Sequence, residues 1–169
     1  MSEERAALLA DLTRAREQLL APVARLDAAI AARRPAPDEW SVVENLLHVA
    51  DLELVTIEHL GRILASDDPP LSGSRGAEFA AERAEAAALG LPGAVARLAT
   101  VRAALLVICG ALDGLHLARA GQHPKFGQRN IAGWLQQRAK HERDHHAQIE
   151  QTIRAISRQA SIDDLIANG

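Results

Sequence analysis

Two histidines near the C-terminal end of the chain have the spacing of metal ligands on a helix. His141 and His145 are four residues apart within the segment HERDHH. Residues four apart lie one above the other on a helix face, so both imidazoles can reach a single ion. His146 is rotated by about 100° from His145 and is expected on the flank. The pair predicts only part of a metal site, because catalytic zinc-type sites use about three protein ligands.

The third ligand is expected from another helix. His48 shares a predicted helix face with Glu44 and Asp51. A metal-bound imidazole usually donates its other N–H to a carboxylate or carbonyl, which makes Asp51 the first candidate for this supporting role and Glu44 the second. Glu44 also follows Ser41 by three residues, the spacing of a helix capping box. The alternative interpretation, three core histidines without a metal, stays open.

Further polar residues share the helix face of His141 and His145. Arg138 and Gln148 lie on this stripe, and Gln148 is expected to orient a ligand or a bound water. Glu142 is the candidate general base, although ideal helix geometry turns it sideways from the histidines. The segment also matches H-E-x-x-H, the zinc metallopeptidase pattern. Its position late in the chain and the lack of a predicted strand to align a peptide argue against a peptidase.

The remaining histidines and the single cysteine are given structural interpretations. His59 lies about 16 Å along the helix axis from His48, too far to share an ion, and is interpreted as a surface or structural residue. His116 and His123 fall in the connection before the last helix, near the expected mouth of the site, as solvated loop residues. Cys109 lies in an apolar run and is predicted to be a buried, unreactive thiol.

Four long segments whose apolar residues recur at helical spacing are expected to position these side chains. No segment shows the period-two alternation of a strand, so the chain is predicted to be all-α, a four-helix bundle over residues 1–158 with a C-terminal tail over 159–169. Within the tail, one short turn of helix is expected. The long helices are predicted over 3–32, 41–65, 92–112 and 130–157, with a short helix over 78–88.

Composition limits the classes of partner. The chain has 169 residues, of which 48% are hydrophobic and 24% charged, as in a globular domain with too much charge for a membrane span. A net charge of −3 and an aromatic content of 2% argue against nucleic-acid binding, which needs basic surfaces and stacking rings. The N-terminus lacks the pattern of a signal peptide, so a cytoplasmic location is expected. A homodimer through apolar residues of the first or third helix is a further expectation.

Two separated motifs resemble those of the DinB/YfiT-like superfamily. Residues 38–51, DEWSVVENLLHVAD, are similar to its W-S-x-x-E-x-L-x-H-x-x-D signature, and residues 141–149, HERDHHAQI, to its H-x-x-x-H-x-x-Q-I signature. The segments Arg62–Leu64 and His123–Gly127 also resemble the family. The resemblance implies a four-helix bundle in which His48, His141 and His145 hold one divalent metal ion, with zinc or nickel expected and iron as an alternative. The family includes members related to thiol-dependent S-transferases and maleylpyruvate isomerase, and many members with no known activity.

Together these observations predict a metal-dependent enzyme that acts on a small molecule, either as a hydrolase or as a transferase that uses a low-molecular-weight thiol. One alternative is a non-catalytic, stress-related metal-binding or interaction protein in which the ion braces the bundle. The metallopeptidase is a weaker alternative. An accessible cavity beside the histidines would favour an enzyme, whereas a closed site would favour a brace.

Overall fold

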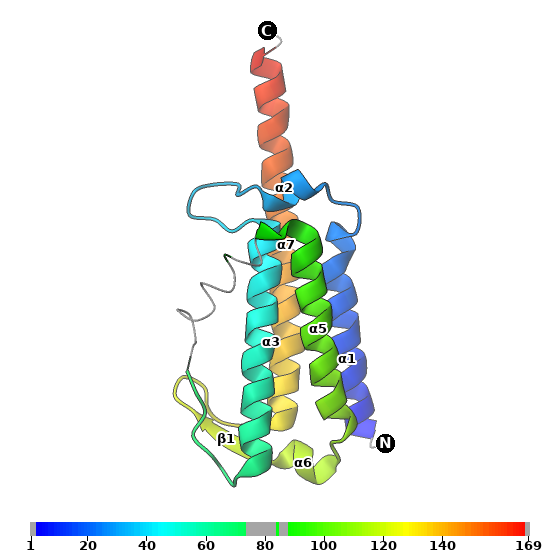
Figure 1. The fold of residues 1–169 in the computed structure, drawn as a ribbon, viewed down its shortest axis with the longest axis vertical. Helices are drawn as coiled ribbons and strands as arrows, with labels where there is room; N and C mark the ends of the chain where they lie inside the picture. The colour runs from blue at the N-terminus through cyan, green and yellow to red at the C-terminus, as the bar shows by residue number, and fades with distance from the viewer. Residues whose placement is uncertain (1–2, 74–83, 85–87, 168–169) are drawn as a thin grey trace.

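Four long helices pack side by side in the computed structural model, which describes residues 3–73, 84 and 88–167 (Figure 1). They are α1 (Glu3–Leu20), α3 (Val42–Ala65), α5 (Gly90–Gly110) and α7 (Ile131–Ala167). Helices α1 and α7 run in one direction, and α3 and α5 run in the other (Figure 1). Helix α1 packs against α7, while α3 contacts both α5 and α7. The predicted four-helix bundle is confirmed.

The prediction of one continuous helix over residues 3–32 is wrong. Helix α1 ends at Leu20, a short 3₁₀ turn, η1, covers Ala21–Val23, and α2 covers Ala28–Ala32. Pro22 accounts for the break, because its ring has no N–H to donate and clashes with the preceding turn of a helix. Asp27 then starts α2 by accepting hydrogen bonds from the backbone N–H groups of Ala29 and Ile30. Apolar residues keep helical spacing on both sides of Pro22, so the sequence pattern gave no sign of the break.

The start of α3 follows the predicted capping box. Ser41 Oγ accepts from the Glu44 N–H at 3.1 Å, and Glu44 Oε2 accepts from the Ser41 N–H at 2.9 Å. These two bonds satisfy backbone donors that the first turn of a helix otherwise leaves open. They also fix the position at which α3 begins, and hence the orientation of the residues one and two turns later.

A β-hairpin lies in the connection that was predicted to lack strands. The short helix α6 (Gly114–Ala118) leads into strand β1 (Ala120–His123), which pairs antiparallel with β2 (Gly127–Asn130). Each strand has four residues, too few for an alternating pattern to stand out. A Cβ atom on Gly121 would lie 3.0 Å from the Pro69 carbonyl oxygen, so only glycine fits this close approach. Asn130 caps α7 as predicted, accepting from the Gly133 N–H at 2.8 Å.

Helix α7 is longer than predicted. It continues without interruption from Ile131 to Ala167, across the expected end at residue 157, and its last turns project beyond the other helices (Figure 1). The segment after Trp134 contains no proline or glycine until Gly169, so nothing in it ends the helix. The prediction that this helix ends near residue 157 and is followed by only one short turn is therefore wrong.

The chain between α3 and α5 joins two helices that run in the same direction (Figure 1). Its first part is held by the hairpin, because Leu71 N–H donates to the Gln122 carbonyl oxygen at 2.8 Å. The short helix predicted over residues 78–88 lies outside the described residues, apart from Ala84 and Ala88, both of which are helical.

The interior has two apolar clusters with charged residues between them. One cluster lies around Leu12, Leu105 and Trp134, and the other around Leu19, Leu98 and Ile149. Among the buried charged residues, four meet between the two clusters, one from each long helix: Arg16, Glu53, Arg102 and Glu142. The core is therefore apolar at both ends and ionic in the middle.

Helix α5 is the most apolar of the four. By length and composition alone it is long and apolar enough to cross a membrane, with a mean hydropathy of 1.6 over its most apolar window. The expectation that charge interrupts every such stretch is wrong for this helix. A single helix of this kind is weak evidence of a membrane span, and here α5 packs against α3 and buries Arg102 in the interior.

Candidate metal centre

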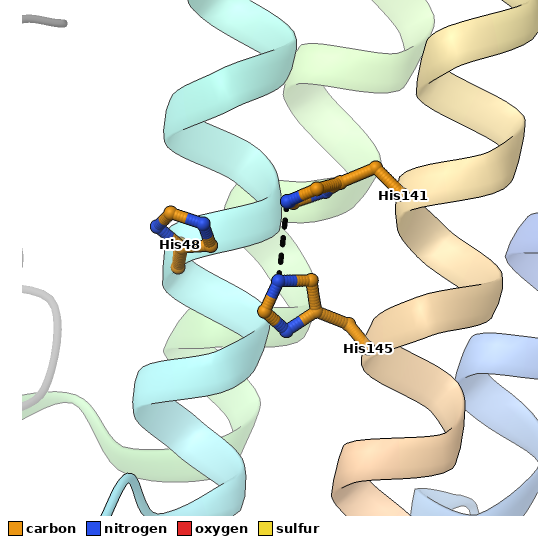
Figure 2. Close-up of side chains that lie close together, drawn as sticks. All are labelled: His48, His141 and His145. Carbon is orange, nitrogen blue, oxygen red and sulfur yellow. Dashed lines mark hydrogen bonds between the residues drawn. The ribbon is translucent and has the colours of Figure 1, made fainter.

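Three histidines meet between α3 and α7. His141 and His145 project from α7 towards α3, which carries His48 (Figure 2). One ligand nitrogen from each imidazole lies within 4.8 Å of the other two. The Nε2 atoms of His141 and His145 are 3.1 Å apart. The structure therefore brings together the three residues that sequence spacing selected as metal ligands.

Asn45 determines which nitrogen of His145 is available. The Asn45 side chain is fully buried, and its Nδ2 donates to the Ser41 carbonyl oxygen at 3.0 Å. Its Oδ1 then lies 2.8 Å from His145 Nδ1. Because an amide oxygen only accepts, His145 carries its proton on Nδ1 and presents an unprotonated Nε2 to the other histidines. Metal-bound histidines usually have this hydrogen bond to a carbonyl or carboxylate.

Sequence reasoning missed Asn45. It selected carboxylates as supporting residues and passed over an amide in the same motif. The signal was present, since Asn45 lies three residues before His48 within an apolar run, where a buried amide needs specific partners.

The donor set fits a divalent metal ion. Zinc–imidazole bonds of about 2.0–2.1 Å with tetrahedral angles place two ligand nitrogens roughly 3.3 Å apart. The 3.1 Å between the Nε2 atoms of His141 and His145 is close to this separation. Three neutral imidazoles suit zinc, nickel, copper or iron, and so do not select one metal.

The surroundings keep His141 and His145 neutral. Burial lowers the pKa of His141 to about 2, with a further contribution from the positive charge of Arg138. Burial and then Arg138 likewise lower the pKa of His145 to about 4. Only neutral imidazole has a free lone pair for a metal, so both residues are in the binding form at neutral pH without losing a proton.

Two cavities reach the histidines from different sides. A polar cleft of about 740 Å³ is lined by His48 and His145 together with Trp40 and Gln148. A more apolar cavity of about 500 Å³ is lined by His48 and His141. The Trp40 ring lies over both His48 and His145, with centroids 4.8 and 6.2 Å away. The site is accessible to a small molecule, and Gln148, predicted to orient a ligand, lies on the wall of the polar cleft.

The two carboxylates expected to support His48 have other partners. Glu44 is held by the capping box and by an ion pair with Arg34, and the Arg34 hydrogen bond is the main influence that lowers its pKa against the effect of burial. Asp51 is fully buried and accepts from Arg97 of α5 at 3.3 Å. A supporting hydrogen bond of the expected kind is instead made by Asn45, and it is made to His145 rather than to His48.

Glu142 does not face the histidines, which corrects its assignment as a general base. Its carboxylate accepts from Arg16 Nε at 3.1 Å and Nη2 at 2.9 Å, and also from Arg102 Nη2. Glu53 completes the network, accepting from Arg16 at 2.7 Å and from Arg102 at 2.6 Å. One residue after His141 is a rotation of about 100°, which turns Glu142 into the bundle core. The glutamate of the H-E-x-x-H match is therefore directed away from the histidines, whereas a metallopeptidase requires it beside the metal.

The other histidines divide between the cavity and the surface. His59, proposed as surface or structural, is structural: it is 1% exposed and its Nε2 lies 3.1 Å from the Ser72 carbonyl oxygen. His123 lies at the wall of the apolar cavity, near the expected mouth, although it belongs to a strand. His116 was placed there too, but instead helps to cap α6 with Asp113. His146 lies on the flank, near Glu150.

Cys109 is buried in the apolar core, as predicted. Its side chain has no exposed surface, and burial raises the pKa of its thiol to about 11. The thiolate is the reactive form, so this residue is not a nucleophile.

Comparison with known families gives a match that covers most of the chain. The family model of the DinB superfamily matches residues 11–149, a range that contains all three histidines. A comparison with curated proteins finds no match.

Solved structures with a similar fold include two described as four-helix bundles and one uncharacterised protein. TT2238, described as a four-helix bundle protein, is 26% identical with a TM-score of 0.65, over 87% of this chain and 98% of that one. YfiT from Bacillus subtilis, described as a probable metal-dependent hydrolase with an unusual four-helix bundle topology, is 16% identical with a TM-score of 0.73, over 95% and 90%. An uncharacterised protein from Clostridium difficile 630 is 12% identical with a TM-score of 0.70, over 89% and 96%.

Proposed function

The chain belongs to the DinB superfamily, and from this premise we propose that it is a metal-dependent enzyme acting on a small molecule. His48, His141 and His145 hold one divalent ion, zinc or nickel, and the reaction is a hydrolysis. The description of YfiT as a probable metal-dependent hydrolase supports this choice, although at 16% identity the likeness itself concerns the fold.

One observation carries the proposal: the hydrogen bond from His145 Nδ1 to Asn45 Oδ1. A core histidine needs no particular tautomer. Here a buried amide, itself oriented by the Ser41 carbonyl, turns the lone pair of Nε2 towards two other imidazoles. This is the arrangement that a metal ligand requires.

His48, His141 and His145 would hold the ion, which would supply Lewis-acid chemistry to a water or a carbonyl. The residues of the chain then supply binding and orientation. Trp40 covers one side of the histidines and limits access of bulk water, and Gln148 offers an amide to hydrogen-bond a substrate or a water in the polar cleft. Within the described residues, the carboxylates lining this cleft are Asp38 and Glu39, which replace Glu142 as candidates to accept a proton.

Cavities on both sides of His48 support an enzyme over a metal that only braces the bundle, since a brace needs no access for substrate. Transfer to a low-molecular-weight thiol remains the second candidate, because the polar cleft has room for a cosubstrate beside the histidines. Cys109 does not supply that thiol, because it is buried.

The test is metal content by elemental analysis, followed by turnover. We expect about one ion per chain in the purified full-length protein and its loss in the His141→Ala, His145→Ala double variant. His146→Ala, on the same helix but on its flank, is the matched control and should keep the ion. Native protein that binds no zinc or nickel after reconstitution would contradict the proposal.

Activity then separates the reaction types. The metal-loaded protein is assayed against a panel of small esters and amides, and in parallel for thiol consumption with electrophilic substrates. Hydrolysis that requires the metal supports the proposal. Thiol-dependent turnover without hydrolysis would favour the second candidate, and metal binding without either activity would favour the brace.

A further inference from the structure

The apolar cavity beside His141 is lined by residues of a different kind from those of the polar cleft. Its sides are formed by Leu52, Val55, Phe126 and Trp134, and its volume of about 500 Å³ falls within the range of small-molecule sites. Trp134 packs edge-on against Phe126, with centroids 6.1 Å apart. The cavity thus offers flat aromatic and branched aliphatic surfaces to the body of a ligand.

Arg138 lines this cavity, and its Nε is buried without a hydrogen-bond partner. Arg138 is only 6% exposed, and its Nε has contact with neither solvent nor an acceptor. A buried guanidinium N–H without a hydrogen-bond partner is costly, because it loses water without replacement. Such a group in a cavity wall indicates a partner that binds there.

The neighbouring charges do not neutralise Arg138. Arg16 and Arg102 are balanced by Glu53 and Glu142 in the core network, with two positive and two negative groups. Both carboxylates are therefore committed, and Arg138 is a third cation close to them. Burial lowers its pKa to about 10 despite the favourable charges of Glu53 and Glu142, so Arg138 is still charged at neutral pH. A divalent ion on the histidines one turn away would add further positive charge.

A second buried donor lines the same cavity. The indole Nε1 of Trp134 is out of reach of solvent and has no acceptor among the described residues. Trp134 and Arg138 are four residues apart on α7, so their side chains lie on one face of the helix. Two unpaired donors and an excess positive charge together call for acceptor oxygens that carry negative charge.

We propose that this cavity binds the carboxylate of a small amphipathic acid, with Arg138 pairing the carboxylate and the apolar walls holding the body of the molecule. A guanidinium matches a carboxylate in charge and in its two-pronged geometry. The proposal rests on the proposed function, because it makes this acid the substrate class: Arg138 is three residues before His141, so a molecule anchored there reaches the histidines with its other polar groups.

The test compares two probes that differ in charge but not in size. Binding of 3-phenylpropionate and of 3-phenylpropionamide is measured by isothermal titration calorimetry, on the full chain with and without metal, and metal content is determined on the same samples. We expect the acid to bind at least about tenfold more tightly than the amide, the difference made by one charge-assisted pair. Arg138→Gln should remove this preference, and Arg138→Lys should keep part of it.

Arg154→Gln is the matched control, since it removes one positive charge from an exposed position on the same helix and should leave the preference intact. Circular dichroism checks that each variant is folded, and the acid–amide comparison on the unaltered protein needs no variant. Equal affinity for the two probes, no binding of either, or a preference that survives in Arg138→Gln would overturn the proposal.

The two proposals fail separately. Metal bound by the histidines without preference for the acid overturns only the carboxylate site. A preference that depends on Arg138, in a protein that takes up no metal, supports the carboxylate site and overturns the metal-dependent function.

Discussion

Asn45 of α3 and His145 of α7, one hundred positions apart in the chain, are joined by a 2.8 Å hydrogen bond from His145 Nδ1 to Asn45 Oδ1. The bond crosses the interface between two helices and determines the tautomer of one histidine of the triad. It therefore links the packing of the bundle to the chemistry of the site.

Replacing Asn45 by leucine, which has a similar volume and no acceptor, should weaken metal binding. Without the bond, His145 is free to protonate Nε2 and to rotate, and loss of such a supporting group typically costs about 10- to 100-fold in metal affinity. Competition with a chromogenic chelator measures the effect. Asn45→Asp keeps an acceptor for Nδ1–H and should bind more tightly than the leucine variant. Unchanged affinity in Asn45→Leu would show that the tautomer is not held by this bond.

Glu142→Gln should destabilise the fold and leave the metal site occupied. The substitution unbalances a buried network in which Glu142 pairs with Arg16 and Arg102, and breaking such a network costs roughly 3–5 kcal/mol of unfolding free energy. Urea unfolding measures the loss. Asp144→Asn, which alters an exposed pair with Lys140, should change the free energy by no more than about 0.5 kcal/mol. A glutamine variant that is fully stable but inactive would instead make Glu142 a catalytic residue.

The metal-free protein should lose stability as the pH falls below about 6.5, the ordinary pKa of histidine. His141 and His145 have lowered pKa values in the folded state, about 2 and 4, so the unfolded chain takes up protons first. Their contribution to stability is complete above the unfolded pKa and is lost progressively as the pH falls from 6.5 to about 4 for His145 and to about 2 for His141. Denaturant unfolding across this range measures the slope, which should be shallower in His145→Gln. An equal slope in that variant would assign the effect to other groups.

Cys109 should be inert in the native protein and reactive after unfolding. Its thiol is buried and its pKa is raised to about 11, so almost no thiolate is present at pH 8. Reaction with a chromogenic disulfide reagent should be slow in buffer and fast in concentrated guanidinium. A native rate close to the denatured rate would mean that the core around α5 opens readily.

The helical periodicity of the sequence was enough to predict the three histidines as a cluster. A helix places residues four apart on one face, and the capping box at Ser41 fixed where α3 begins, so His48 could be positioned without knowledge of the fold. The same reasoning failed at Pro22, where a strong apolar pattern outweighed a single helix-breaking residue, and at the hairpin, where the strands are too short to show alternation.

The partners of buried polar groups could not be predicted in this way. Glu142 is paired with Arg16, which lies 126 positions earlier in the chain, and local spacing carries no information about such a contact. Sequence alone shows only that charged residues interrupt apolar faces. Which arginine meets which glutamate, and that Arg138 meets neither, depends on how four helices are arranged.

The buried charged residues Arg16, Glu53, Arg102 and Glu142 form an ionic layer across the middle of the bundle. This layer also selects how the four helices are arranged. Helix faces rich in leucine, valine and alanine can slide past one another by one turn, about 5.4 Å, and still bury similar area. The layer does not tolerate such a shift: Arg16 and Arg102 donate not only to the two glutamates but also to the backbone carbonyl oxygens of Leu98 and Leu12, both at 2.9 Å. Each arginine thus ties α1 to α5 at a single height, and Glu142 ties α7 to both. Only in that register does His48 stand level with His141 and His145, so four charged residues that never touch the imidazoles decide whether the three of them can meet.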